Sequence, residues 1–119
     1  MAVPERENFR FVRGDTFAQN VTIKNCLEEI TEIYFTVKAS YEEKMPVIQK
    51  TLTNGGITFL EDTEDGKKYN VLINATDTDS MKVDADYVYD MQIVSGTTKI
   101  TVLKGTITLE ADVTKTINE

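Results

Sequence analysis

The sequence predicts one all-β domain, an antiparallel sandwich, from three observations. β-branched and aromatic residues alternate with polar ones along most of the chain, which is the period of half-buried strands. Short clusters of Gly, Asn, Asp and Ser separate these stretches at close spacing, as turns between strands do. Helical spacing is almost absent, so no helices connect parallel strands. An antiparallel sandwich of about 7–9 strands is therefore expected, with a closed barrel as the alternative.

Length and composition fit a single soluble domain spanning residues 1–119. Hydrophobic residues make up 40% and charged residues 28%, which is typical of a chain with a packed core. The net charge of −7 repels phosphate groups, so neither nucleic acid nor an anionic membrane is an expected partner. Residues 1–8 are charged, and no apolar run is long enough for a signal peptide or a membrane helix.

The alternation places strands at residues 9–12, 16–24, 30–39, 47–52, 57–60, 69–73, 87–94 and 99–113. The clearest is 30–39, where Ile33, Phe35, Val37 and Ala39 share one face. In 16–24 the apolar face is Phe17, Val21 and Ile23, interrupted by Gln19. One face of each strand is therefore expected to be buried.

The connections also carry signals. Pro46 restricts its neighbours, so 47–52 is expected to be an edge strand or a crossing strand. Residues 61–68 are predicted to form a polar turn closed by Gly66, and 74–86 an acidic connection. Thr76 or Asp77 would cap a single helical turn within it.

The last two strands contain the longest apolar rows. In 87–94 the row is Tyr87, Tyr89, Met91 and Ile93, and this strand is expected to be central. In 99–113 the row is Ile100 and Val102, then Ile107 and Leu109. Because the parity switches, a β-bulge or bend is predicted at 103–105, with Gly105 giving the backbone its freedom.

One local feature favours an immunoglobulin-like sandwich. The acidic turn Asp84-Ala85-Asp86 enters the central strand at Tyr87, as in the tyrosine corner of such domains. Tyr87 is therefore a candidate for a hydroxyl that bonds back to the preceding turn. The simpler interpretation is a core tyrosine whose hydroxyl reaches the rim.

No catalytic pattern stands out. The chain has no His, and its one cysteine, Cys26, is interpreted as structural, since nothing activates it as a thiolate. No Ser, Lys or carboxylate pair lies in a recognisable nucleophile or glycosidase motif. We therefore expect no enzyme activity, no cofactor and no metal.

Three short motifs have ordinary explanations. Arg13-Gly14-Asp15 matches the integrin-binding tripeptide, but a turn between two strands also favours Gly and Asp. Four acidic residues, Asp77, Asp79, Asp84 and Asp86, suggest calcium but lack the EF-hand glycine and closing glutamate. The sequons at Asn20 and Asn74 are interpreted as chance matches.

Phe9, Phe11, Tyr34 and Tyr41, with the pair Tyr87 and Tyr89, could together line a sugar-binding or receptor-binding face. With no Trp in the chain, core packing is the favoured interpretation. A carbohydrate-binding or receptor-binding module stays open as the alternative function.

Four segments, taken in order, point to a family. They are FVRGDTF at 11–17, DTDSM at 77–81, ADYVYDM at 85–91 and LKGTITLEADVT at 103–114. Together they resemble small β-sandwich proteins encoded among the tail and baseplate genes of phages and prophages in Gram-positive bacteria. The resemblance covers nearly the whole chain. It departs from the family just before the tyrosine strand, where the family would have a glycine and this chain has Val83-Asp84-Ala85-Asp86.

The resemblance implies an immunoglobulin-like structural or assembly module of a phage tail or baseplate. Such a module would be made in the bacterial cytoplasm, reside in the virion, and bind other virion proteins or copies of itself. Gly14, Asp15, Tyr87, Asp90 and Gly105 would then shape the fold and bind no ligand.

Overall fold

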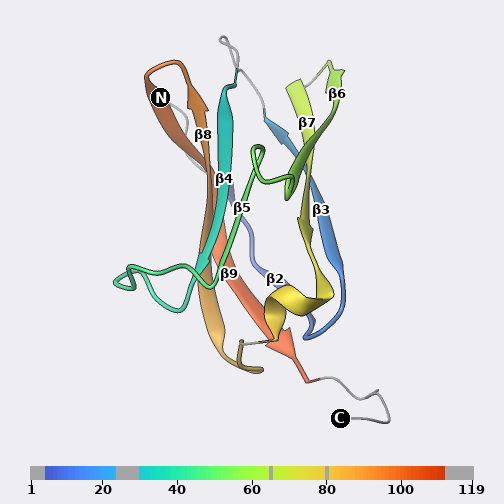
Figure 1. Cartoon of the computed structure of the whole chain (residues 1–119), viewed down its shortest axis with the longest axis vertical. Helices are drawn as coiled ribbons and strands as arrows, with labels where there is room; N and C mark the ends of the chain where they lie inside the picture. Colours follow the sequence, from blue (N-terminus) through green and yellow to red (C-terminus); the bar gives the residue numbers. More distant parts are fainter. Residues whose placement is uncertain (1–4, 24–29, 65, 80, 112–119) are drawn as a thin grey trace.

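Two β-sheets pack face to face in the computed structural model, which describes residues 5–23, 30–64, 66–79 and 81–111 (Figure 1). Sheet A has the strand order β1-β9-β8-β4-β5, with β2 also paired to β9. Sheet B has the order β3-β7-β6. The prediction of an all-β sandwich is confirmed.

The described residues form nine strands and one short 3₁₀ helix. Their bounds are β1 Glu5–Arg6, β2 Phe9–Val12, β3 Phe17–Ile23, β4 Glu32–Lys38, β5 Ile48–Thr51, β6 Ile57–Thr63, β7 Gly66–Ile73, η1 Ala75–Thr78, β8 Asp86–Ser95 and β9 Thr98–Glu110.

Sheet A is not purely antiparallel, which corrects the prediction. β8 lies between β4 and β9, antiparallel to both, and is central as expected. β1 and β2, however, run parallel to β9, with Glu5 opposite Leu103 and Phe9 opposite Ile107. Alternation of side chains is the same in parallel and antiparallel strands, so it did not reveal this pairing.

The strand order is that of an immunoglobulin-like sandwich. In such folds the second, fifth and fourth strands form one sheet, and the third, sixth and seventh form the other. Here β3-β7-β6 and β4-β8-β9 occupy those positions, and β5 extends the second sheet. The place beside β3 that the first strand takes in the four-stranded sheet is not filled by any described strand.

The core lies between the sheets and consists of the residues that alternation placed inward. The most completely buried side chains include Ile33, Phe35 and Val37 of β4 and Tyr89 and Met91 of β8. The inward rows of β7 and β9 complete it with Tyr69, Val71, Ile73, Leu103, Ile107 and Leu109. Ala39 is an exception to the predicted row, because β4 ends at Lys38 and Ala39 is exposed.

The polar turn predicted at 61–68 is wrong. Residues 61–63 and 66–68 continue β6 and β7, so the turn is confined to the tip of this hairpin. Asp62 lies opposite Lys67, and their side chains form an ion pair at 3.0 Å. The tip of a hairpin that reaches solvent can be polar on both of its strands, so composition alone suggests a loop.

The predicted bulge in the last strand exists, one residue earlier than expected. Met91 pairs with Leu103 and Gln92 with Thr101, so Val102 is the extra residue. This insertion turns Leu103 and the alternate residues after it toward the core. Edge-strand character for β5 is likewise confirmed.

Gly105 has a different role from the predicted one. A Cβ at this position would lie 2.0 Å from the carbonyl oxygen of Glu7, so only glycine lets the chain between β1 and β2 approach β9. The Tyr89 hydroxyl donates to the same Glu7 oxygen at 2.6 Å. Gly105 is therefore a site of close backbone contact.

The helical turn in the acidic connection is η1, and Asn74 is its N-cap. The prediction of Thr76 or Asp77 as the cap is wrong by two or three positions. Asp77 instead accepts a hydrogen bond from the Asn74 backbone N–H at 2.7 Å. Its carboxylate thus closes the first turn from inside the helix.

Candidate protein-interaction surfaces

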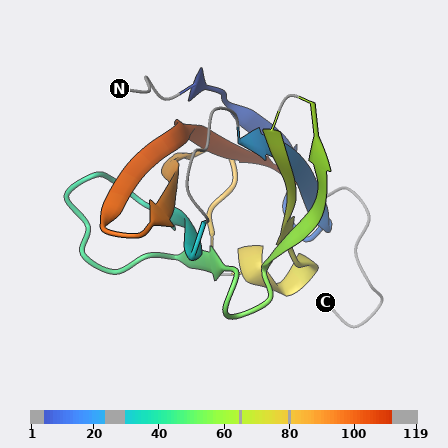
Figure 2. The same cartoon turned by 90° about the horizontal axis from the view of Figure 1, so that it is seen from above.

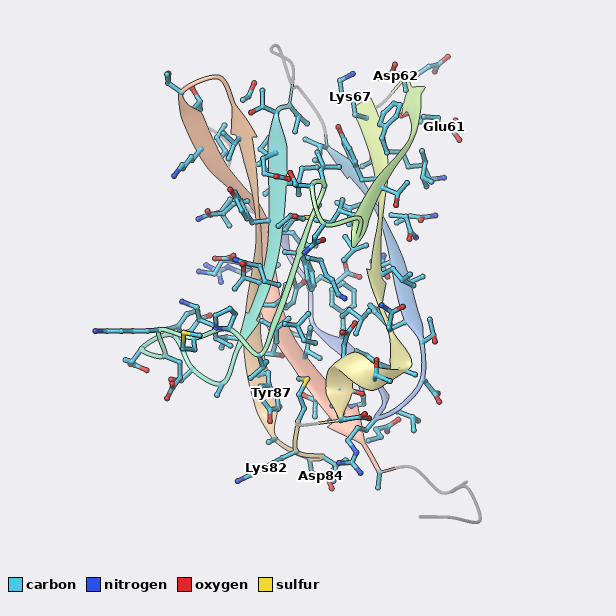
Figure 3. All side chains as sticks on the ribbon, in the orientation of Figure 1. Glu61, Asp62, Lys67, Lys82, Asp84 and Tyr87 are labelled. Carbon is cyan, nitrogen blue, oxygen red and sulfur yellow. The ribbon has the colours of Figure 1, made fainter. Side chains whose placement is uncertain are left out.

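The tyrosine corner is present. Tyr87 is buried, and its hydroxyl oxygen accepts a hydrogen bond from the Lys82 backbone N–H at 2.8 Å. Lys82, Asp84 and Tyr87 lie together at the end of the sandwich from which β8 starts (Figure 3). This turn therefore closes on the start of β8 through the Tyr87 hydroxyl.

Asp84 occupies the turn where the resemblance leads one to expect glycine. Its φ of 57° is in the left-handed region that favours glycine, and Asp84 is the one described non-glycine residue with positive φ. Its backbone N–H donates to the Leu109 carbonyl at 2.8 Å. Asp is among the few side chains that tolerate this conformation.

The acidic residues of the 74–86 connection do not converge. Asp77 forms an ion pair with Lys50 at 2.7 Å, whereas Asp86 accepts a hydrogen bond from the Thr108 hydroxyl at 2.6 Å. Across the described part of the chain, no three carboxylate, His or Cys side chains lie close enough to hold a metal ion. Asp77 and Asp86 therefore each have a local structural partner.

Arg13-Gly14-Asp15 forms the exposed turn between β2 and β3. Gly14 has a φ of 91°, and its N–H donates to the buried Thr78 hydroxyl at 3.0 Å. The Arg13 guanidinium reaches the Met81 carbonyl at 3.5 Å. The predicted turn is therefore present, and it is fastened to the segment around η1.

The aromatic residues proposed for a sugar platform are not brought together on one exposed face. Phe9 is in the core, Phe11 stacks on Phe17 with ring centroids 4.4 Å apart, and Tyr34 is half-buried on β4. Tyr41 alone is fully on the surface, in a loop. Cys26 lies outside the described residues.

The loop 39–47, between β4 and β5, carries the most exposed large apolar side chains. Tyr41 keeps 67% and Met45 77% of its full exposure, and Val47 is also exposed. Figure 2 shows the loop extending from the edge of sheet A on the side away from sheet B. The sequence pattern did not identify this surface, although Tyr41 and Met45 flank the charged residues 42–44.

The loop is held against the outer face of sheet A by one cation–π contact. The Lys104 ammonium lies 5.6 Å from the centre of the Tyr41 ring. Lys104 of β9 is opposite Asp90 of β8. Burial raises the pKa of the Asp90 carboxyl, and the nearby charges of Lys104 and Lys38 oppose that rise. Charged and apolar groups therefore adjoin on this face.

A second, smaller apolar surface lies on β6, where Phe59 and Leu60 are both about half exposed. Phe59 meets the Tyr69 ring edge-on at 5.4 Å and lies under the Lys67 ammonium at 5.7 Å. Glu61, Asp62 and Lys67 cluster at this end of the β6–β7 hairpin (Figure 3). The two apolar surfaces are thus on different sheets.

Comparison with known proteins adds no assignment, since neither a family model nor a curated protein matches the sequence. Within the described residues, no helix has the length and apolar character needed to cross a membrane.

Proposed function

We propose that this protein is a non-enzymatic structural or assembly module of a phage or prophage tail or baseplate, acting through contacts with other virion proteins. The sequence resemblance suggests the setting. The observation that carries the interaction role is the 39–47 loop, which displays Tyr41 and Met45 to solvent. Exposed aromatic and Met side chains are the types enriched in protein interfaces.

The chemistry around the loop suits a protein partner. Tyr41 and Met45 would supply the apolar centre of a contact, while Glu42, Glu43 and Lys44 between them would form a polar rim. An apolar centre within a polar rim is the usual anatomy of a specific protein interface. The adjoining Lys104 is already in contact with Tyr41, so it would help to fix the loop before binding.

The experiment is pairwise binding of the purified chain to the products of its neighbouring genes, measured by size-exclusion chromatography with light scattering. We expect a complex with at least one tail or baseplate protein. The double variant Tyr41→Ser, Met45→Ser should abolish that complex without a change in melting temperature, because both side chains are exposed.

The matched control is Leu60→Ser, which removes an exposed apolar side chain from the other sheet and should leave the complex intact. Lack of binding to every neighbouring product, or a genomic neighbourhood without tail genes, would contradict the proposal. Loss of binding in the control as well would contradict the assignment of the loop.

A further inference from the structure

Strand β3 has one side, called here the open side, that no described strand pairs with. It pairs with β7 without interruption from Phe17 opposite Ile73 to Ile23 opposite Lys67. On its other side, no described strand is present. In immunoglobulin-like sandwiches the first strand occupies this position, but here β1 and β2 both belong to sheet A. As far as the described residues go, this edge of sheet B is therefore available to an added strand.

The other edges carry the features by which proteins prevent such pairing. β6 has a register shift between Phe59 and Glu61, and its second half is acidic. β5 is only four residues long and contains Lys50. β2 is also four residues long, and it carries Arg10. β3 is seven residues long, FAQNVTI, with no charge, Pro, Gly or bulge.

The hydrogen-bond phase of sheet B identifies the groups on the open side. The Leu72 N–H donates to the Gly56 carbonyl at 2.9 Å, so Leu72 directs its backbone toward β6. Along β7, successive residues direct their backbone N–H and C=O groups alternately toward β6 and toward β3. In β3, the residues opposite Leu72 and every second residue of β7 before it are Ala18, Asn20 and Thr22. These three residues therefore point their N–H and C=O groups to the open side.

We propose that two copies of this chain associate by pairing β3 with β3, antiparallel about a two-fold axis at Asn20. Ala18 would then lie opposite Thr22 of the partner subunit, and Asn20 opposite its own copy. The three strands of each sheet B would join into one continuous sheet. This inference concerns a different surface from the proposed function and does not depend on it.

Three properties of β3 favour a second copy as the occupant. The open groups of Ala18, Asn20 and Thr22 are spaced symmetrically about Asn20, so each of these three residues can exchange two hydrogen bonds with the residue that it faces. The strand is uncharged, so it can face itself even though each chain carries a net charge of −7. Phe17 and Val21 are only partly buried behind this edge, so the second strand would cover them.

The polar contacts of Asn20 are compatible with this pairing. Its side-chain oxygen accepts from the Asn70 amide at 2.9 Å, and its backbone carbonyl accepts from the Gln19 amide at 3.1 Å. A carbonyl oxygen has two lone pairs, so the Gln19 bond leaves one for a partner strand. The Asn20 side chain itself is exposed and would remain so.

Sedimentation equilibrium over a wide range of concentrations tests the proposal. We expect a monomer–dimer equilibrium for the unaltered chain. Asn20→Lys and Asn20→Glu should each weaken dimerisation by about tenfold or more, because like charges would meet at the axis. An equimolar mixture of the two variants should restore the dimer, since opposite charges then face each other.

Thr58→Lys is the control. Thr58 is exposed on β6 and lies in the same cross-strand row as Asn20, because both residues are opposite Asn70 of β7. The control variant should dimerise like the unaltered chain, and all variants should melt at nearly the same temperature when monomeric. A strictly monomeric unaltered chain, a dimer unaffected by Asn20→Lys, or a mixture that stays monomeric would each overturn the proposal.

Discussion

Tyr87 joins the start of β8 to the turn before it through one hydrogen bond. Replacing Tyr87 by Phe removes the bond to the Lys82 N–H and keeps the buried ring. We expect a loss of about 1 kcal/mol in the free energy of unfolding, measured by urea denaturation. Tyr34→Phe is the control, and it should cost less because the Tyr34 ring is half-buried on the outer face. Equal losses of stability in the two variants would show that the hydrogen bond of the tyrosine corner does not contribute to stability.

Gly105 permits the chain between β1 and β2 to touch β9. In Gly105→Ala the new methyl group would collide with the Glu7 carbonyl, so this segment must move away. We expect a loss of about 1–3 kcal/mol in stability and faster amide exchange at Glu7, whose N–H donates to the Lys104 carbonyl.

Gly55→Ala separates this contact from simple backbone strain. Gly55 has a φ of 82°, but a Cβ there would meet no atom within 4 Å. That variant should lose about 1 kcal/mol and keep the exchange protection of Glu7. Unchanged exchange at Glu7 in Gly105→Ala would show that the close contact is unimportant.

Asp84 is placed where glycine would be unstrained. Asp84→Gly should leave stability within about 1 kcal/mol of the original or raise it, since relief of the left-handed strain offsets the greater freedom of the unfolded chain. Asp84→Val should lose about 1–2 kcal/mol, because a β-branched residue is disfavoured at positive φ. Thermal unfolding of the pair checks the order, and a more stable Val variant would contradict it.

Residue roles were predictable from the sequence only where a local pattern defines them. The acidic turn before a tyrosine predicts the corner at Tyr87, because both partners lie within a few residues. The role of Gly105 depends on Glu7, almost one hundred positions away, and no local pattern contains that contact. The apolar loop was missed because exposure of Tyr41 and Met45 depends on where the loop projects.

At the scale of elements, Glu32 fastens the turn after β5 to the start of β4. Its carboxylate accepts hydrogen bonds from the Leu52 N–H at 2.9 Å and from the Thr53 N–H and hydroxyl. The Thr53 hydroxyl, followed by backbone N–H groups, holds the pKa of the Glu32 carboxyl below its ordinary value, against the effect of burial.

This lowered pKa predicts that the stability lost on replacing Glu32 depends on pH. The ionised Glu32 stabilises the fold fully above the pKa of an unfolded Glu, about 4.3, and this contribution is lost as pH falls through the lower folded pKa. Glu32→Gln should therefore lose about 1–2 kcal/mol near neutral pH and nothing at strongly acidic pH. Urea midpoints across pH test this, and a pH-independent difference would contradict it.

Strand positions were predictable because each buried face repeats every second residue. Partners and directions were not, because they depend on contacts between distant segments. The bulge at Val102 was detected, since it reverses the parity within one strand. The extensions of β6 and β7 were missed, since polar residues at the tip of a hairpin have the composition of a loop.

At the scale of the whole molecule, one ion pair joins the two sheets. Lys50 of β5 belongs to sheet A, and Asp77 follows β7 of sheet B; their side chains retain only 13% and 25% of their exposure. The Lys50 stem passes over Gly56, where a Cβ would lie 2.5 Å from its Cδ. The glycine leaves room for the lysine to cross between the sheets.

Breaking this pair should weaken the sandwich. We expect Lys50→Met and Asp77→Asn each to lose about 1–2 kcal/mol, and the double variant to lose less than the sum. Glu110→Gln, which removes the exposed ion pair with Arg10, should change stability by less than about 0.5 kcal/mol. Additive losses in the cycle would show that the Lys50–Asp77 pair is not coupled.

The parallel pairing of β1 and β2 with β9 has a mechanical consequence. The first and last strands are neighbours that run in the same direction, so the two ends of the described chain leave from opposite ends of one ladder. Tension along the polypeptide would load the hydrogen bonds of this ladder together in shear, and the strands cannot separate one bond at a time. The sandwich would therefore resist stretching between its ends.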